Sequence, residues 1–270
     1  MKIHAMGGMP RSGSTLLCNI LNQNPKLHAS STSVLPAIVN SVVRTWSSSP
    51  EVKSELNNNR KKTEERSSRS LRAFIKEWHK GLEKEIVFDK SRGWNINFLP
   101  FFDMFPESKI IVPVRDLRAI TASCEKQHRK TPLFDDSDKP VLKTLFGRVS
   151  RLFSNQDIIG SALMGAEDML RRNDPRVLFL QYESLVDNPE SVMKQLYKHL
   201  GEEYYKHDFE NIKNTAKDPD GFYLWKYPHN KATGKVVPQE TENYQKYLSK
   251  DVVEEIMKRG QFYNSQFGYF

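Results

Sequence analysis

Cysteines are scarce in this sequence, and the two that are present, Cys18 and Cys124, lie far apart. Neither belongs to a CxxC pair or to a cluster with histidines. This usage excludes a disulfide framework and is unlike the spacing of cysteine-based metal sites. We expect two free, partly buried thiols, as is usual for proteins of a reducing compartment.

Long apolar runs are absent as well, because none approaches the ~18 residues that a membrane-spanning helix needs. Residues 1–9 contain a short apolar stretch, but it leads directly into a glycine-containing loop. That context predicts a buried strand and not a signal peptide. We therefore expect a protein of the cytoplasm with no membrane partner.

No Gly/Ser-rich or Pro-rich linker divides the 270 residues, of which 38% are hydrophobic. A single domain over residues 1–270 is the simplest organisation for such a chain. Residues 47–68 are rich in Ser, Asn, Lys and Glu, and we expect them to form a flexible or helical excursion over the surface.

The formal net charge of +8 indicates a protein that binds anions. Nucleic acid is the first candidate, but the Lys and Arg residues are scattered among acids, and no zinc-finger spacing or RNP motif is present. The strongest basic run, residues 60–62, is followed at once by Glu64 and Glu65, which is typical of a solvated helix face. We therefore expect no nucleic-acid partner.

The periodicity of apolar residues predicts strands that alternate with helices. The strands are expected at residues 2–9, 85–90, 108–116 and 176–185, and the helices at 14–22, 33–46, 70–84, 95–105, 117–130, 188–201 and 249–268, with one long helix or two over 139–173. This order predicts an α/β fold with a central parallel sheet flanked by helices on both faces. Phe101 and Phe102, and also Phe74 and Trp78, are expected in the core.

Residues 8–15, "GMPRSGST", fit the phosphate-loop pattern G-x-x-x-x-G-K-[ST] except that Ser14 replaces the lysine. The backbone N–H groups of such a loop, with the helix that follows, can still cradle a phosphate. Arg11 partly replaces the missing cation, Pro10 fixes the backbone before it, and Ser14 and Thr15 supply hydroxyls. The fold is therefore expected to be of the P-loop-containing kind.

A nucleoside triphosphatase would also need a strand-end Asp to hold Mg²⁺. The strand "IIVPV" ends instead in Arg115, and the Asp116 that follows can pair with Arg118 or cap the next helix. The strand "IVFD" does end in Asp89, beside Lys90, so a kinase with Asp89 as metal ligand remains an alternative. The pattern favours a cradle that neutralises its anion with side chains and without a metal.

These segments resemble the sulfotransferase family, whose members use 3′-phosphoadenosine 5′-phosphosulfate (PAPS). Residues 10–17, "PRSGSTLL", are similar to the family's 5′-phosphosulfate loop, and residues 114–123, "VRDLRAITAS", are similar to its 3′-phosphate motif. Residues 179–201 resemble a later strand–loop–helix, and residues 89–94, "DKSRGW", resemble a segment with a lysine near the transferred group. The tyrosylprotein sulfotransferase-like branch is the most similar.

The resemblance implies transfer of a sulfuryl group from PAPS to a hydroxyl or amine, without a metal, and release of adenosine 3′,5′-bisphosphate (PAP). The acceptor would be a peptide tyrosine, a glycan or a small molecule. Arg11 and Lys90 would act on the transferred group, and residues 220–247 would cover the cofactor. The implied cofactor-binding residues are Pro10, Arg11, Ser12, Gly13, Ser14, Thr15, Arg115, Ser123, Tyr182 and Lys246.

The sequence departs from the family where a general base should take the acceptor's proton. After the first helix it reads "HASSTSVLP", with no carboxylate, and the segment around Lys90 contains no histidine. His28 and Asp89 are the nearest candidates for this base. A non-catalytic nucleotide-binding module is a further alternative, because such a protein would need no base.

Overall fold

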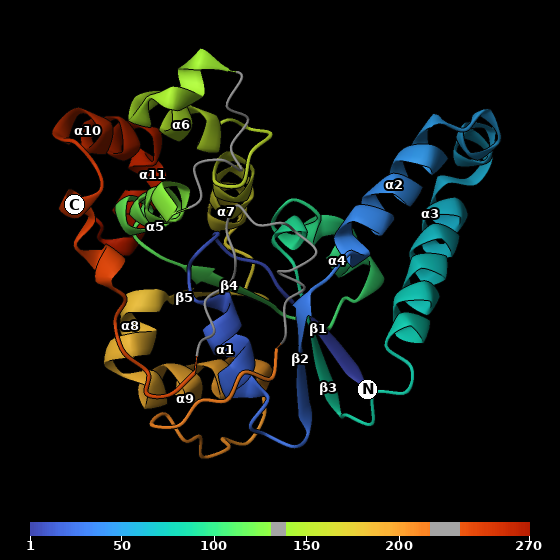
Figure 1. Ribbon diagram of the computed structural model, residues 1–270. Helices are drawn as coiled ribbons and strands as arrows, with labels where there is room; N and C mark the ends of the chain where they lie inside the picture. Colours follow the sequence, from blue (N-terminus) through green and yellow to red (C-terminus); the bar gives the residue numbers. More distant parts are fainter. Residues whose placement is uncertain (131–138, 217–232) are drawn as a thin grey trace.

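The chain folds around one parallel sheet in the computed structural model, which describes residues 1–130, 139–216 and 233–270 (Figure 1). The strand order is β2-β3-β1-β4-β5, and every neighbouring pair is parallel. The strands are β1 (Lys2–Met6), β2 (Leu27–Thr32), β3 (Ile86–Lys90), β4 (Ile110–Val114) and β5 (Val177–Gln181).

Helices connect the strands, as parallel pairing requires. The α-helices are α1 (Ser14–Leu21), α2 (Leu35–Ser48), α3 (Pro50–Trp78), α4 (Phe98–Met104), α5 (Leu117–Lys130), α6 (Leu145–Leu152), α7 (Gly160–Arg172), α8 (Tyr182–Asp187), α9 (Pro189–Leu200), α10 (Lys250–Arg259) and α11 (Gln261–Phe267). Short 3-10 turns are η1 (Arg92–Asn95), η3 (Pro140–Lys143), η4 (Glu240–Glu242) and η5 (Tyr244–Lys246).

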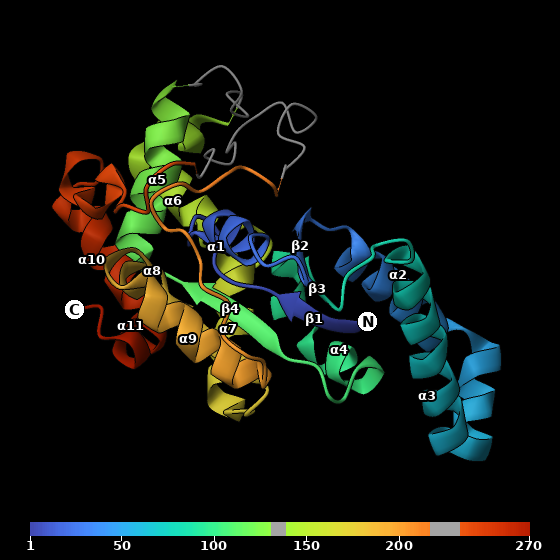
Figure 2. The same ribbon diagram turned by 90° about the horizontal axis from the view of Figure 1, so that it is seen from below.

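Successive side chains of β4 point to opposite faces of the sheet and pack against different helices. Ile111 packs into a cluster with residues of α1, α8 and α9, whereas Ile110 and Val112 pack into a second cluster with residues of α4 and α7. Helices therefore cover both faces: in Figure 1, α7 lies on one side of β4 and α1, α8 and α9 lie on the other, and Figure 2 views the sheet from the side of α8 and α9. The predicted α/β class with a flanked parallel sheet is confirmed.

The sheet order places the loop after β1 at the centre of the molecule. From β1 the chain passes to the edge strand β2, returns to β3 between β2 and β1, and then crosses to β4 and β5 on the other side. Crevices at the carboxyl ends of strands, where the order reverses in this way, are the usual ligand sites of such sheets. The ends of β1, β3 and β4 therefore meet at one edge.

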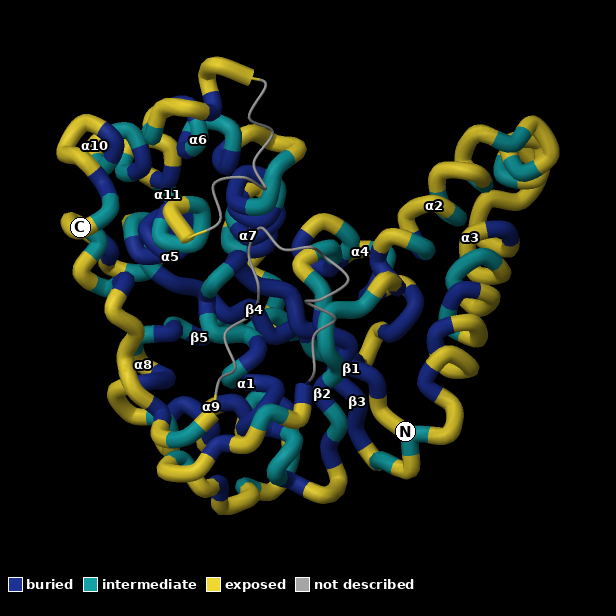
Figure 3. The backbone as a smooth tube through the Cα atoms, in the orientation of Figure 1, coloured by how far each residue is buried: buried dark blue, intermediate teal, exposed yellow. Residues whose placement is uncertain are grey.

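Helices α2 and α3 form an antiparallel pair that projects from the body, here called the α2–α3 hairpin (Figure 1). The polar residues 47–68 span the end of α2 and the first part of α3, whose helical backbone is interrupted at Asn59. The helix expected at 70–84 is the last part of α3 and ends at Trp78. The tip of the hairpin is exposed, whereas the sheet is buried (Figure 3).

Two expectations from the sequence were wrong: Phe74 and Trp78 are 41% and 51% exposed, not in the core, and residues 182–185, expected at the end of a strand, belong to α8. Strand β2 was not predicted. Other expectations hold: Phe101 and Phe102 are buried, both cysteines are buried and free, and the segment 139–173 contains two α-helices. The single domain over residues 1–270 stays a prediction.

Within the described ranges, no helix has both the length and the apolar character needed to span a bilayer. The longest helix, α3, is polar over most of its length.

His4 on β1 is a buried titratable side chain in the sheet. Its Nδ1 accepts a hydrogen bond from the Lys109 backbone N–H at 3.0 Å, so the neutral ring carries its proton on Nε2. Burial is the main cause that lowers the pKa of His4 to about 4. Protonation at Nδ1 would break this bond and place a charge in the core.

We expect acid to destabilise the fold through His4. Between pH 6.5 and about 4 the unfolded chain binds this proton and the folded chain does not, so stability falls as pH falls. The loss is about 1.4 kcal/mol for each unit of the pKa difference. Urea unfolding at pH 7.5 and pH 5 should show a smaller loss for His4→Gln than for wild type. His207, whose pKa is also lowered by burial, is present in both proteins and contributes the same loss of stability to each. Equal losses in the two proteins would therefore contradict the role of His4.

Candidate functional site

The loop of residues 7–13 joins β1 to α1 and is tied to β4. Backbone N–H groups of Gly7 and Met9 donate to the carbonyls of Ile111 and Pro113, both at 2.9 Å. The Ser12 hydroxyl donates to the Met9 carbonyl at 2.6 Å and is buried. Ser12 therefore closes the loop on itself. The loop reaches α1 with its shape fixed from both sides.

Gly13 is the N-cap of α1 and has a left-handed backbone, with φ of 80°. A Cβ atom at this position would lie 2.6 Å from Cδ2 of Tyr182, the first residue of α8. Arg11 also has a positive φ, of 60°, which is uncommon for a residue with a side chain. The Tyr182 ring therefore packs directly on the end of the loop.

Asn95 is a buried residue of η1 that supports the loop from behind. Its Oδ1 accepts from the Gly8 N–H at 2.7 Å, and its Nδ2 donates to the carbonyls of Gly8 and Ala162 at 3.2 and 3.1 Å. One side chain thereby joins the loop to α7. Sequence reasoning missed Asn95, because no local pattern marks an asparagine that acts at this distance along the chain.

Lys90 is the last residue of β3, and its ammonium group lies at the start of α1. Nζ donates to Thr15 Oγ1 at 3.2 Å, and the side chain is only 4% exposed. The Lys90 backbone N–H donates to the Ser30 hydroxyl at the end of β2. The structure therefore brings Lys90 and the loop together.

Asp89 and His28 lie on the opposite face of the sheet from the Lys90 amine, because successive strand residues alternate. Asp89 is buried, accepts from Trp94 Nε1 at 2.7 Å, and lies 3.4 Å from Nε2 of His79. His28 pairs with Val87 on β3, and burial, followed by the charge of His79, lowers its pKa. Their expected role as base beside the transferred group does not fit this placement.

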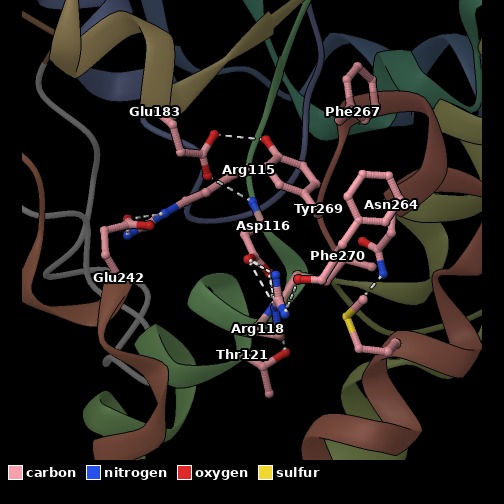
Figure 4. Close-up of polar contacts among 12 residues, drawn as sticks. Arg115, Asp116, Arg118, Thr121, Glu183, Glu242, Asn264, Phe267, Tyr269 and Phe270 are labelled. Carbon is pink, nitrogen blue, oxygen red and sulfur yellow. Dashed lines mark hydrogen bonds and ion pairs between the residues drawn. The ribbon is translucent and has the colours of Figure 1, made fainter.

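The Arg115 guanidinium, at the tip of β4, is buried and is contacted by three distant segments, of which Figure 4 shows the one that carries Glu242. Nε and Nη2 both donate to Glu242 Oε1, and Nη2 also donates to Thr241 Oγ1. Nη1 donates to the Arg11 carbonyl at 2.8 Å. The Tyr182 ring lies 4.3 Å from the guanidinium carbon, within cation–π distance.

The backbone of Arg115 is fixed by Tyr263 of α11. The Tyr263 hydroxyl accepts from the Arg115 N–H at 3.0 Å and donates to its carbonyl at 2.9 Å. The next residue, Asp116, caps α5 by accepting from the Arg118 N–H and also pairs with the Arg118 guanidinium. Both alternatives that the sequence offered for Asp116 therefore occur together.

Ser123 lies in the second turn of α5 and accepts from Arg11 Nε at 3.1 Å. The neighbouring Cys124 is buried, and burial raises the pKa of its thiol to about 11. The thiol is therefore protonated at neutral pH and is a poor nucleophile. Of this pair, Ser123 is the group that faces the loop.

Lys246 lies on η5 and is exposed, with Nζ 3.7 Å from Glu240 Oε1. Part of the expected covering segment 220–247 falls on residues 217–232, outside the described residues. Within the described ranges, no group of three or more His, Cys, Asp or Glu side chains is arranged to hold a metal ion.

The arrangement offers one loop with two cationic ends. Lys90 lies where α1 begins, and Arg115 lies with Ser123 on the other side of Arg11. The first-turn N–H groups of a helix have no acceptor within that helix, so α1 adds donors between the two ends. Such a site can bind a ligand with two separated phosphate groups.

The sequence pattern that describes the sulfotransferase family matches residues 5–206. Among curated proteins, the omega-hydroxy-beta-dihydromenaquinone-9 sulfotransferases of Mycobacterium tuberculosis and Mycobacterium bovis are each 25% identical over 142 residues. The aligned part covers 49% of this chain and 33% of each relative, so this chain matches about a third of their length.

Solved sulfotransferase structures share the fold. The sulfotransferase domain of the Synechococcus PCC 7002 olefin synthase has a TM-score of 0.56 and 15% identity, over 96% of this chain and 94% of that one. A mouse sulfotransferase complexed with PAP has a TM-score of 0.55 and 14% identity, over 96% and 81% of the two chains.

We expect Gly13→Ala to destabilise the protein more than Gly81→Ala. Both glycines have positive φ, so both substitutions strain the backbone by about 1–2 kcal/mol. Only at Gly13 would the new Cβ also meet a neighbour, the Tyr182 ring, since nothing lies within 4 Å at Gly81. Urea unfolding of the two variants measures the difference. Equal losses of stability in the two variants would show that the Tyr182 ring moves aside at no cost in free energy.

Proposed function

This chain belongs to the sulfotransferase family, and on that premise we propose that it transfers a sulfuryl group from PAPS to a hydroxyl or amine acceptor. When bound, PAPS supplies the activated sulfuryl group, whose bond to the bridging phosphate oxygen breaks as the acceptor oxygen or nitrogen bonds to sulfur. PAP is then the product. The observation that carries the proposal is the loop with a cation at each end, Lys90 and Arg115.

The residues present fit the two phosphate groups of such a cofactor. We assign the 5′-phosphate end to Arg11, Ser14, Thr15 and the start of α1, with Pro10, Ser12 and Gly13 shaping the loop. Arg115 and Ser123 hold the 3′-phosphate, and Tyr182 supports the Arg115 guanidinium. A mouse sulfotransferase of the same fold has been solved with PAP, which supports PAP as the kind of ligand that this site binds.

Lys90 is assigned to the charge that develops on the bridging oxygen during transfer. Its ammonium group is almost fully buried, and a buried cation stabilises a developing negative charge more strongly than an exposed one. Arg11 stabilises the equatorial oxygens of the transferred group. Lys90 thus acts on the bridging oxygen, and Arg11 acts on the equatorial oxygens.

The acceptor carries a hydroxyl group in this proposal. The mycobacterial relatives are named for a hydroxylated menaquinone, which supports a small-molecule acceptor over a peptide tyrosine or a glycan. Neither His28 nor Asp89 keeps the role of general base, because both side chains face away from Lys90. The same position of Asp89 opposes the kinase alternative, which needs this carboxylate at the loop.

We also propose three further properties of this protein, its domain organisation, a segment that covers the cofactor, and its location in the cell. Residues 1–270 form one domain, the segment 220–247 with Lys246 covers the cofactor, and the protein acts in the cytoplasm.

Arg115→Ala should weaken binding of PAP by about 10- to 150-fold, because a hydrogen bond to a charged group contributes about 1.5–3 kcal/mol. Isothermal titration calorimetry of wild type and variant with PAP, and with ATP plus Mg²⁺, measures this. Arg172→Ala is the control, since that arginine is on the surface of α7 and pairs with Asp168. Binding of Mg·ATP alone would refute the sulfotransferase proposal in favour of a kinase.

Lys90→Met should lower kcat about 10²–10³-fold and change KM for PAPS little, as expected for a group that acts on developing charge. Release of PAP with a panel of hydroxylated acceptors gives both constants. Lys26→Met, at an exposed surface site, should behave as wild type. Full turnover of Lys90→Met would remove this role from Lys90. Binding of PAP without turnover by the wild type on any acceptor would favour the non-catalytic module.

A further inference from the structure

The Arg115 guanidinium has five N–H donors, and four of them are already used in this structure. Nε donates to Glu242 and Nη1 donates once to the Arg11 carbonyl. Nη2 donates to both Glu242 and Thr241. Within the described residues, one N–H of the group is left. A phosphate that binds an arginine through two parallel hydrogen bonds needs one more donor than this.

Glu242 is the anion that now neutralises Arg115. Its side chain is one-third exposed, whereas that of Arg115 is 3% exposed. Burial raises the pKa of Glu242, and the charge of Arg115 opposes this rise. A phosphate on the same guanidinium would stand beside this carboxylate, and two like charges at such a distance repel strongly where water is excluded.

The segment that carries Glu242 is short and is attached to the body on either side of this residue. Glu242 is the last residue of η4, a single 3-10 turn, so no long helix holds it in place. The flanking residues are attached to α5 independently: Glu240 pairs with Lys126, and the Tyr244 ring lies 4.9 Å from the Arg118 guanidinium carbon. The Glu242 side chain can therefore turn outward while its neighbours keep the segment in place.

We propose that Glu242 determines how strongly this site prefers nucleotides with a 3′-phosphate, because its carboxylate occupies the Arg115 donors that this phosphate must take. This inference rests on the proposed function, which assigns the 3′-phosphate to Arg115. Binding of PAPS or PAP breaks the Glu242–Arg115 pair, and binding of a nucleotide without a 3′-phosphate leaves it intact. Glu242 thus weakens binding of the 3′-phosphorylated nucleotides selectively.

The test is calorimetric titration of wild type, Glu242→Gln and Glu242→Ala with PAP and with adenosine 5′-monophosphate. Both variants should bind PAP about tenfold more tightly than wild type, because like charges next to each other at a binding site are costly. Binding of adenosine 5′-monophosphate should not change. Glu190→Gln is the control: it removes the same charge from an exposed pair with Lys194 on α9, outside the segment 220–247, and should alter PAP affinity less than about threefold.

Each other outcome overturns the inference in a recognisable way. PAP affinity that is unchanged or weaker in both Glu242 variants would show that Glu242 holds Arg115 in position. Equal tightening of both nucleotides would show a general effect of charge. Failure of PAP to bind to any of the proteins, with Arg115 intact, would refute the proposed function itself and this inference with it.

Discussion

A buried guanidinium must be matched by an anion and by hydrogen-bond acceptors, because a buried charge without them costs more free energy than a domain can lose. Arg115 imposes this constraint here. Its partners are the carbonyl of Arg11, the Tyr182 ring and the Glu242 carboxylate, which come from three distant parts of the chain. Tyr263 holds the backbone of the same residue. One cation therefore fixes how the phosphate loop, the end of β5 and the C-terminal segment lie relative to one another.

The parts of the fold that could be predicted from the sequence are those with strong local patterns. Strands β1, β3, β4 and β5 have nearly continuous apolar runs, as expected for strands buried on both faces. Strand β2, "LHASST", has only two side chains turned to the core and is held in the sheet mainly by pairing with β3. Phe74 and Trp78 follow helical spacing but are on the outer side of α3, because periodicity identifies a face and not what covers it.

The residues of the site fall into the same two groups, those that follow a local sequence pattern and those that do not. Arg11 follows β1, Arg115 follows β4, and Ser123 lies one turn into the helix after β4, so the sequence could place them together, and the structure does. Asn95 acts on the loop, and Glu242 acts on Arg115, from remote positions that no local pattern connects with the site. Asp89 illustrates a different error: it is adjacent to Lys90 in the sequence, but neighbouring residues of a strand point to opposite faces.

The α2–α3 hairpin is anchored only at its base. The buried residues of α2 are in its first two turns, and those of α3 are Thr63, near its middle, and Leu71 and Ile75, toward its end. Substitutions and length changes near the tip therefore remove few packing contacts, and surface changes of this kind are usually close to neutral for stability. Selection for folding acts weakly on this part of the molecule. Over evolutionary time the hairpin can diverge faster than the sheet that supports it, and it is also the natural place to insert a reporter sequence.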